Sequence, residues 1–363
     1  MLITGNKGEW SEIYVLFKIL GQGKLYAADE KLNKIDDIFY DIIKILRKEN
    51  IETIEYRFIE KLKEIKIINS DKNTLIINLP AKKFEYEAEK MFIQIKTHKK
   101  KTFSLPETQE FMEQIYINKL KAPSADKTDI RIQIHDLNTG YEPELGFSIK
   151  SRLGKPSTLL NPGPSTNFTY RIIGDINETE QQNFNNNDSN TLKDKLNIFL
   201  NKGYQIEFIE VENKKFNNNL VLIDSKLSEI MAYLLLEYYI NGYVNIKEAI
   251  ESLNKKNPLK YDLEYNHNFY SYKVKHFISE VALGMTPATI WDGNADVTGG
   301  YIIVREDGEV LCYHLYNRNE FENYLLNNTK FEMASRGRYN FGKIYKENNE
   351  YKIKLNLQIR FIK

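Results

Sequence analysis

The sequence lacks several features that assign a chain to a common class of protein. Its 363 residues include a single cysteine, Cys312, which excludes an internal disulfide framework and any multi-cysteine zinc or iron–sulfur site. No apolar run reaches the length that a bilayer span requires, and the start, MLITGNKGEW, lacks the apolar core of a signal peptide. These absences predict a cytoplasmic protein.

The sequence also lacks an excess of charge of either sign, since it has 51 basic and 50 acidic residues and a net charge of +1. This balance does not point to a nucleic-acid-binding protein. It does not exclude one either, because phosphate binding needs a local basic surface rather than a basic total. The densest basic cluster is KTHKKK at 96–101, which fits a solvated loop and a phosphate-contacting segment equally well.

Hydrophobic periodicity predicts a mixed α/β chain, and its length suits two domains or one elaborated domain. Helical spacing is found at 8–20, 35–48, 51–67, 83–97, 107–119, 191–202, 224–240, 245–254, 270–283 and 318–327. Strands are expected at 25–28, 74–79, 301–307, 309–316 and 351–361. The segment 183–190, NFNNNDSN, is typical of a loop. We therefore expect one domain at 1–182, and a helical and then strand-rich region at 191–363.

The segment 127–151, KTDIRIQIHDLNTGYEPELGFSIKS, shows strict period-two alternation in both arms and predicts a hairpin with one buried face. The Asn-Thr-Gly sequence at 138–140 supplies the turn. Antiparallel pairing about this turn predicts that Asp129 lies opposite Lys150, with Ser148 one step along the same polar face. Gly146 is expected to leave that face open near the turn.

Phosphodiester hydrolysis is the chemistry that these residue types fit. Mg²⁺ binds through a few carboxylates plus substrate oxygens, and it activates its bound water. Asp129 would supply the ligand, and Lys150 would supply a cation near the attacking water. A surface salt bridge explains the same pair without catalysis. His135 and Asp136 lie about four strand residues from Lys150, roughly 13 Å away, so we expect them to be turn or DNA-contact residues.

Several long motifs follow one another along the chain: GNKGEWSEIY (5–14), LGFSIKSRLG (145–154), TLLNPGPSTNFTY (158–170), DGNADVTGGYIIV (292–304), and NTKFE, RYNFGKIY and IKLNLQIRF between 328 and 361. In this order they resemble the HpaII-type restriction endonucleases. The resemblance implies a PD-(D/E)xK restriction-endonuclease-like core, with a mixed central sheet flanked by helices, large helical insertions and a strand-rich C-terminal region that completes the sheet and contributes to DNA recognition.

In that resemblance Asp129 matches the first aspartate of the motif and Lys150 matches its lysine. The sequence departs from the motif at Ser148, where an Asp or Glu is usual, and a hydroxyl replaces a carboxylate poorly as a metal ligand. The resemblance implies that a glutamate from the first core helix takes its place. Glu12 fits best and Glu9 less well, while Glu144 lies at the distal end of the strand and ranks third.

Residues expected to contact DNA follow the catalytic strand or lie near the C-terminus: Arg152, Asn161, Thr166, Asn167, Arg336 and Arg338. Arginine reads guanine in the major groove through two hydrogen bonds, which favours the Arg-Gly-Arg segment at 336–338. The alternative to DNA contact is an ordered turn at 158–170 and a solvated basic loop at 336–338.

The resemblance implies a type II restriction endonuclease that cuts double-stranded DNA at a short palindromic site, with Mg²⁺ as cofactor. The family's best-known site is CCGG, which implies a homodimer and a cognate DNA methyltransferase as system partner. Two alternatives stay open. One is a repair or recombination nuclease of the same fold that recognises DNA structure, and the other is a DNA-binding protein whose catalytic site has decayed.

Overall fold

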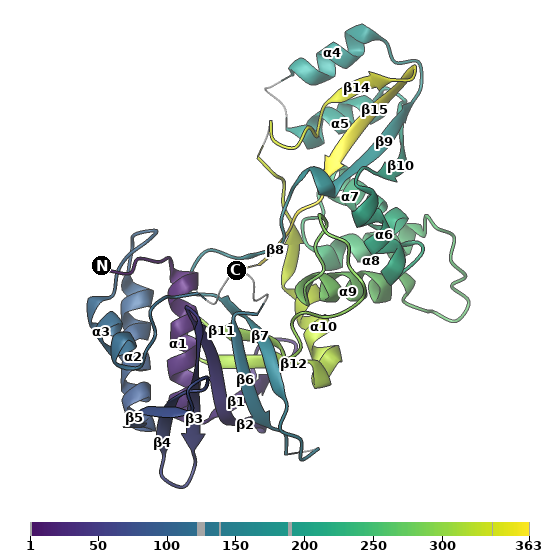
Figure 1. The fold of residues 1–363 in the computed structure, drawn as a ribbon. Coiled ribbons are helices and arrows are strands. Elements are labelled where there is room, and N and C mark those ends of the chain that lie inside the picture. Colours follow the sequence, from purple (N-terminus) through teal and green to yellow (C-terminus); the bar gives the residue numbers. More distant parts are fainter. Residues whose placement is uncertain (1, 122–127, 138, 188–190, 336, 363) are drawn as a thin grey trace. The chain divides into compact units, whose positions relative to one another are not determined.

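The computed structural model describes residues 2–121, 128–137, 139–187, 191–335 and 337–362 (Figure 1). Contacts along the chain group these residues into two compact units. The first unit contains the described residues up to 157 together with 296–324, and the second contains 158–295 together with 325–362. The segment 183–190, where we expected a domain boundary, begins inside a helix of the second unit, Glu178–Asn186.

A nine-stranded mixed sheet forms the first unit, in the order β1-β12-β11-β7-β6-β2-β3-β4-β5. Most neighbours are antiparallel, whereas β1 with β12 and β11 with β7 are parallel pairs. The strands are β1 (Lys24–Ala28), β2 (Lys34–Glu49), β3 (Glu52–Ile59), β4 (Glu64–Asn69), β5 (Thr74–Pro80), β6 (Ile130–His135), β7 (Glu144–Ser151), β11 (Gly300–Val304) and β12 (Val310–His314).

This sheet closes on itself because β1 pairs with both β12 and the first half of β2. The strands β1, β12, β11, β7, β6 and β2 thereby make a barrel-like ring, and β3, β4 and β5 extend from it. The expected mixed sheet with helices is therefore present. The expected strands at 25–28 and 74–79 are confirmed. Those expected at 301–307 and 309–316 end earlier, at Val304 and His314, and the strand expected at 351–361 is two strands, Glu350–Asn356 and Ile359–Phe361.

Two of the helix predictions, at 35–48 and at 51–67, are wrong. Residues 35–48 lie in β2, where a bulge between Ile42 and Lys44 inserts Ile43 and breaks the period-two pattern, so that the apolar spacing resembles that of a helix. Residues 51–67 form the hairpin of β3 and β4. Its turn includes Lys63 in the left-handed region, at φ +50°, and lacks the Gly, Pro and Asn that usually mark a turn.

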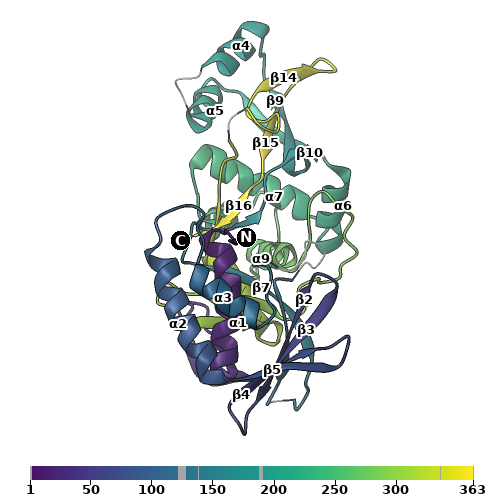
Figure 2. The same cartoon turned by 60° about the vertical axis from the view of Figure 1, so that its left-hand side comes forward.

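Three helices cover one face of the sheet: α1 (Lys7–Gln22), α2 (Ala81–Thr97) and α3 (Pro106–Gln114). Figures 1 and 2 show them side by side. The rings of Phe17, Phe84 and Phe111 join the three helices, with centroids 5.2–6.1 Å apart. The helices expected at 8–20 and 83–97 are confirmed, whereas the helix expected at 107–119 ends five residues early, at Gln114.

The hairpin of β6 and β7 is present, but its register differs from the expected one. Ile130 pairs with Phe147 and Gln133 pairs with Glu144, so Asp129 lies opposite Ser148 rather than Lys150. The turn is therefore centred one residue earlier than expected. A shift of two residues in pairing leaves each side chain on its expected face. Gly146 does not leave open space, because the side chain of Thr128 packs directly against it.

His314, the last residue of β12, is buried where its ring contacts Tyr40 of β2 and Phe147 of β7, with centroids 4.8 and 6.1 Å away. Its Nδ1 accepts a hydrogen bond from the Tyr316 N–H, while its Nε2 has no hydrogen-bond partner among the described residues. Burial lowers the pKa of His314 to about 4, and the nearby charge of Asp136 opposes this shift only in part. The folded unit thus favours the neutral ring.

We expect the first unit to lose stability as the pH falls from about 6.5 toward 4, because only the unfolded chain gains a proton there. The loss should be on the order of 3 kcal/mol. Urea unfolding at a series of pH values measures it, and His314→Gln, which cannot titrate, should flatten the dependence. Equal slopes for the wild type and the variant would show that other groups cause the acid sensitivity.

The second unit holds two smaller antiparallel sheets, in the orders β10-β9-β15-β14 and β13-β16-β8. Its strands are β8 (Thr158–Leu160), β9 (Asn167–Ile173), β10 (Gln205–Val211), β13 (Thr329–Phe331), β14 (Ile344–Glu347), β15 (Glu350–Asn356) and β16 (Ile359–Phe361). Its helices are α4 (Glu178–Asn186), α5 (Leu192–Asn201), α6 (Lys214–Ile223), α7 (Leu227–Leu236), α8 (Ile246–Lys256) and α9 (Phe269–Ala282), and α10 (Arg318–Asn327) crosses the boundary between the units. The expected helices near 191–202, 224–240, 245–254, 270–283 and 318–327 are confirmed.

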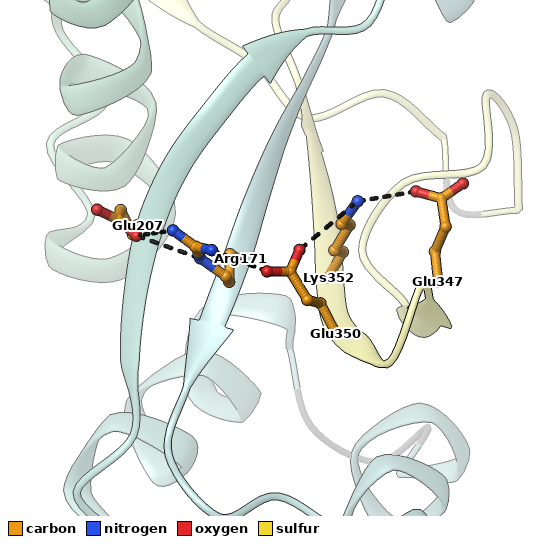
Figure 3. A network of polar contacts seen from close by, with 5 residues as sticks. All are labelled: Arg171, Glu207, Glu347, Glu350 and Lys352. Carbon is orange, nitrogen blue, oxygen red and sulfur yellow. Dashed lines mark hydrogen bonds and ion pairs between the residues drawn. The ribbon is translucent and has the colours of Figure 1, made fainter.

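One face of the four-stranded sheet carries a row of paired charges (Figure 3). Arg171 of β9 bridges Glu207 and Glu350, each at 2.8 Å, and Lys352 pairs with Glu347 at 2.9 Å. Such exposed pairs contribute about 0–1 kcal/mol each to stability. Both cations of this network therefore already have carboxylate partners.

Among the helices that the structure describes, none is long and apolar enough to cross a membrane.

Candidate active site

A cleft of about 860 Å³ in the first unit brings together parts of the chain that are far apart in sequence. Its walls are the N-terminal half of α1, the basic segment 98–101, Lys121, Asp129 just before β6, and 149–151 and 153–157 at and beyond the end of β7. The cleft thus contains Asp129 and Lys150, which the sequence predicted, together with Glu9 and Glu12 of α1.

The side chains of Asp129, Ser148 and Lys150 form a continuous hydrogen-bonded chain. The Ile149 N–H and the Ser148 hydroxyl donate to Asp129 Oδ2 at 2.6 and 3.0 Å, and Lys150 Nζ donates to Ser148 Oγ at 2.7 Å. The backbone of Asp129 is fixed as well, because its N–H donates to the Phe147 carbonyl. Ser148 therefore links the carboxylate to the ammonium group and holds both in place.

Lys150 lies in a poorly solvated position at the end of β7. Burial lowers the pKa of its ammonium group, and the negative charges of Asp129 and Glu12 act in the opposite direction. These two acids thus offset part of the cost of burying the ammonium group.

Glu12 projects from α1 into the cleft that also contains Asp129 and Lys150. Its Oε2 is buried and has no hydrogen-bond partner among the described residues. Burial, followed by repulsion from Asp129, raises the pKa of Glu12 to about 8, while the cations Arg47, Lys121 and Lys150 oppose this rise. Burying a carboxylate oxygen without a partner is costly, so this site suits a cation between Glu12 and Asp129.

The other two candidate glutamates are already engaged. Glu9 accepts a hydrogen bond from the Asn6 N–H at 2.7 Å as part of the capping box of α1, and it pairs with Lys121 at 2.8 Å. Glu144 pairs with Arg131 at 2.5 Å, at the far end of the hairpin. Glu12 is thus the candidate whose carboxylate combines an unpartnered buried oxygen with proximity to Asp129.

The carboxylate oxygens of Asp129 and Glu12 are donors of the kind that hard divalent cations prefer. The described residues contain no group of three or more His, Cys, Asp or Glu arranged to hold a metal ion. Mg²⁺ usually keeps several waters and binds through one or two carboxylates plus substrate phosphate. Asp129 and Glu12 would supply those two carboxylates.

The cleft is also rich in lysines that have no carboxylate partner within the described ranges. Lys99, Lys100, Lys101 and Lys155 are exposed and make no such pair, whereas Lys121 pairs with Glu9. The structure thus places three lysines of the 96–101 cluster in the same cleft as Asp129. Lys121 and Lys155 were not singled out from the sequence, because no spacing distinguishes them from other surface lysines.

Other predicted DNA-contact residues lie elsewhere. The guanidinium of Arg152 donates a hydrogen bond to the Tyr324 hydroxyl. In the second unit Asn161 and Arg338 are exposed, and Arg336 lies outside the described residues. His135 pairs with Glu142, and the buried Asp136 accepts a hydrogen bond from Thr139, as expected for turn residues.

Thr166 and Asn167 are 0% and 1% exposed. Both accept hydrogen bonds from the Asn356 side chain, and Asn167 also donates to the Tyr339 carbonyl at 2.8 Å. This buried network favours the alternative of an ordered turn over direct contact with phosphate.

Comparison with known proteins agrees over the whole chain. A family described as "HpaII restriction endonuclease" matches residues 6–361. A type II restriction enzyme, HpaII from Haemophilus parainfluenzae, is 44% identical over 361 residues, which are 99% of each chain. No solved structure matches. The chain belongs to the HpaII restriction endonuclease family.

Proposed function

We propose that this protein is a Mg²⁺-dependent type II restriction endonuclease that hydrolyses phosphodiester bonds of duplex DNA in the cleft of its first unit. The observation that carries the proposal is the Asp129–Ser148–Lys150 chain beside Glu12, whose buried Oε2 has no hydrogen-bond partner among the described residues. Membership of the HpaII family supports the reaction, and the lysines at 99–101, which pair with no carboxylate in the described part of the chain, support an anionic substrate.

Asp129 and Glu12 would hold the metal ion, which when bound activates water and neutralises charge on the scissile phosphate. Lys150 holds an ammonium group at the end of β7, where it stabilises negative charge as the phosphate is attacked. The hydroxyl of Ser148 orients both Asp129 and Lys150. Ser148 is thus a positioning residue in this proposal, and Glu12 replaces the carboxylate that the motif usually carries there.

We propose further that the first unit is an elaborated PD-(D/E)xK core. In support, an antiparallel hairpin with the candidate ligands has a parallel neighbour in β11, and α1 contributes a glutamate to the site. The second unit would contribute DNA recognition through Arg336 and Arg338. Asn161 and Arg152 remain weaker candidates for DNA contacts.

The recognition site that we propose is CCGG, read by a homodimer in the cytoplasm, with a cognate DNA methyltransferase protecting the host. A homodimer suits a palindrome because each subunit can present the same surface to one strand.

Plasmid digestion tests the proposed function. Discrete fragments with Mg²⁺, and intact plasmid with EDTA, are the expected results, and sequencing of the fragment ends gives the site. Cutting only at branched or flapped DNA would instead identify a repair nuclease. Sequence-specific binding without any cutting would identify a protein with a decayed site.

Glu12→Gln is expected to reduce the cleavage rate by at least about 10²-fold, because it removes a charged oxygen ligand and keeps the shape of the side chain. Glu9→Gln is the matched control on the same helix, and it should cost less than about tenfold in rate while weakening the N-terminus of α1. Single-turnover cleavage and thermal unfolding of both variants separate the two effects. The reverse order of rates would assign the second ligand to Glu9.

A further inference from the structure

A buried tyrosine lies beside the catalytic strand and plays no part in the proposed function. Tyr301 of β11 is in register with Ser148 of the parallel strand β7, so both side chains lie on the same face of the sheet as Lys150. Lys150 Nζ lies over the Tyr301 ring, 5.0 Å from its centroid. The ammonium group therefore has two neighbours that fix its place, the Ser148 hydroxyl and the face of this ring.

The ring is itself held rigidly. Tyr301 is 2% exposed and packs edge-on against Phe321 of α10, with centroids 5.3 Å apart. Its cross-strand partner on β12 is Tyr313, which stacks on Tyr324 at 4.3 Å. This aromatic wall, made of Tyr301, Tyr313, Phe321 and Tyr324, belongs wholly to the first unit.

We propose that Tyr301 is a positioning residue for Lys150, in which the face of the aromatic ring holds the protonated ammonium group beside Ser148 and Asp129. The inference rests on the proposed function, because it assigns a task to Lys150 in cleavage. An aromatic face attracts a cation more strongly where water is excluded. A lysine on a flexible four-carbon chain otherwise samples many positions, and holding a group at its point of action raises the rate of the chemical step rather than the affinity for substrate.

Three variants test this proposal. Tyr301→Leu removes the ring face and should lower kcat by about 30-fold, with KM and DNA affinity in Ca²⁺ unchanged. Tyr301→Phe keeps the ring face and should retain kcat within about threefold. Tyr313→Leu is the matched control, since it removes an equally buried tyrosine from the adjacent strand, and it should lower the melting temperature without the selective loss of kcat. A Phe variant as slow as the Leu variant would overturn the role of the ring.

A double-mutant cycle separates positioning from general packing. In a Lys150→Ala background, Tyr301→Leu should cause no further loss in single-turnover rate, because the group that the ring holds is absent. A further 30-fold loss of single-turnover rate in that background would show that Tyr301 acts independently of Lys150 and would contradict the proposal. If Lys150→Ala alone cuts normally, the proposed active site fails instead, so the two failures are distinguishable.

Discussion

Lys150→Ala should reduce the cleavage rate by about 10³-fold or more while leaving sequence-specific binding in Ca²⁺ within a few-fold of the wild type. The ammonium group is expected to act on charge that develops in the transition state, so its loss affects the chemical step more than docking. Removing it also leaves the Ser148 hydroxyl without the partner that now donates to it at 2.7 Å.

Single-turnover cleavage and a gel-shift assay measure these two quantities. Lys155→Ala is the matched control, because Lys155 lines the same cleft but is exposed and lies outside the Asp129–Ser148–Lys150 chain. It should weaken DNA binding modestly and leave the rate at saturating DNA unchanged. Cutting by Lys150→Ala at near the wild-type rate would move the active site away from this hairpin.

Asp129→Asn is expected to reduce the rate by several orders of magnitude and to raise the Mg²⁺ concentration needed for half-maximal activity. The amide keeps the shape of the side chain, and its oxygen can still accept from the Ile149 N–H, so the fold of the hairpin should survive. Circular dichroism and a Mg²⁺ titration of the cleavage rate check both expectations.

Asp136→Asn is the comparison that tests the register of the hairpin. Asp136 is buried at the turn and accepts a hydrogen bond from Thr139, so its substitution should affect stability more than the rate. Loss of cleavage in Asp136→Asn, together with a near wild-type cleavage rate in Asp129→Asn, would contradict the assignment of Asp129 as a metal ligand.

The candidate site was largely predictable from the sequence because its residues lie on a short amphipathic hairpin. Period-two alternation placed Asp129, Ser148 and Lys150 on one face, and that face is the same in the structure. The pairing was not predictable, because the length and conformation of the turn set the register, and an Asn-Thr-Gly signal does not locate its centre. The capping box of Glu9 has a signal in the sequence, since Asn6 is followed three residues later by Glu9, and this signal separates Glu9 from Glu12.

The remaining errors arise where pairing partners are distant or irregular. The bulge at Ile43 gives the sequence of β2 an apolar spacing that resembles that of a helix. The turn between β3 and β4 contains no Gly, Pro or Asn that would mark it as a turn. The pairing of β7 with β11, and with it the position of Tyr301 beside Lys150, depends on a contact that local periodicity cannot reveal.

The pairing of β7 with β11 also determines when the strands around the site can come together during synthesis. Phe147 pairs with Gly300, a separation of 153 residues (300 − 147), and the intervening chain builds most of the second unit. At roughly 5–20 residues per second, synthesis needs about 8–30 s to pass from one strand to the other. During that interval the hairpin has Asp129 and Lys150 but lacks the strand that carries Tyr301. The nascent chain can therefore complete the strand arrangement around the candidate site only when β11 has been synthesised, late in translation.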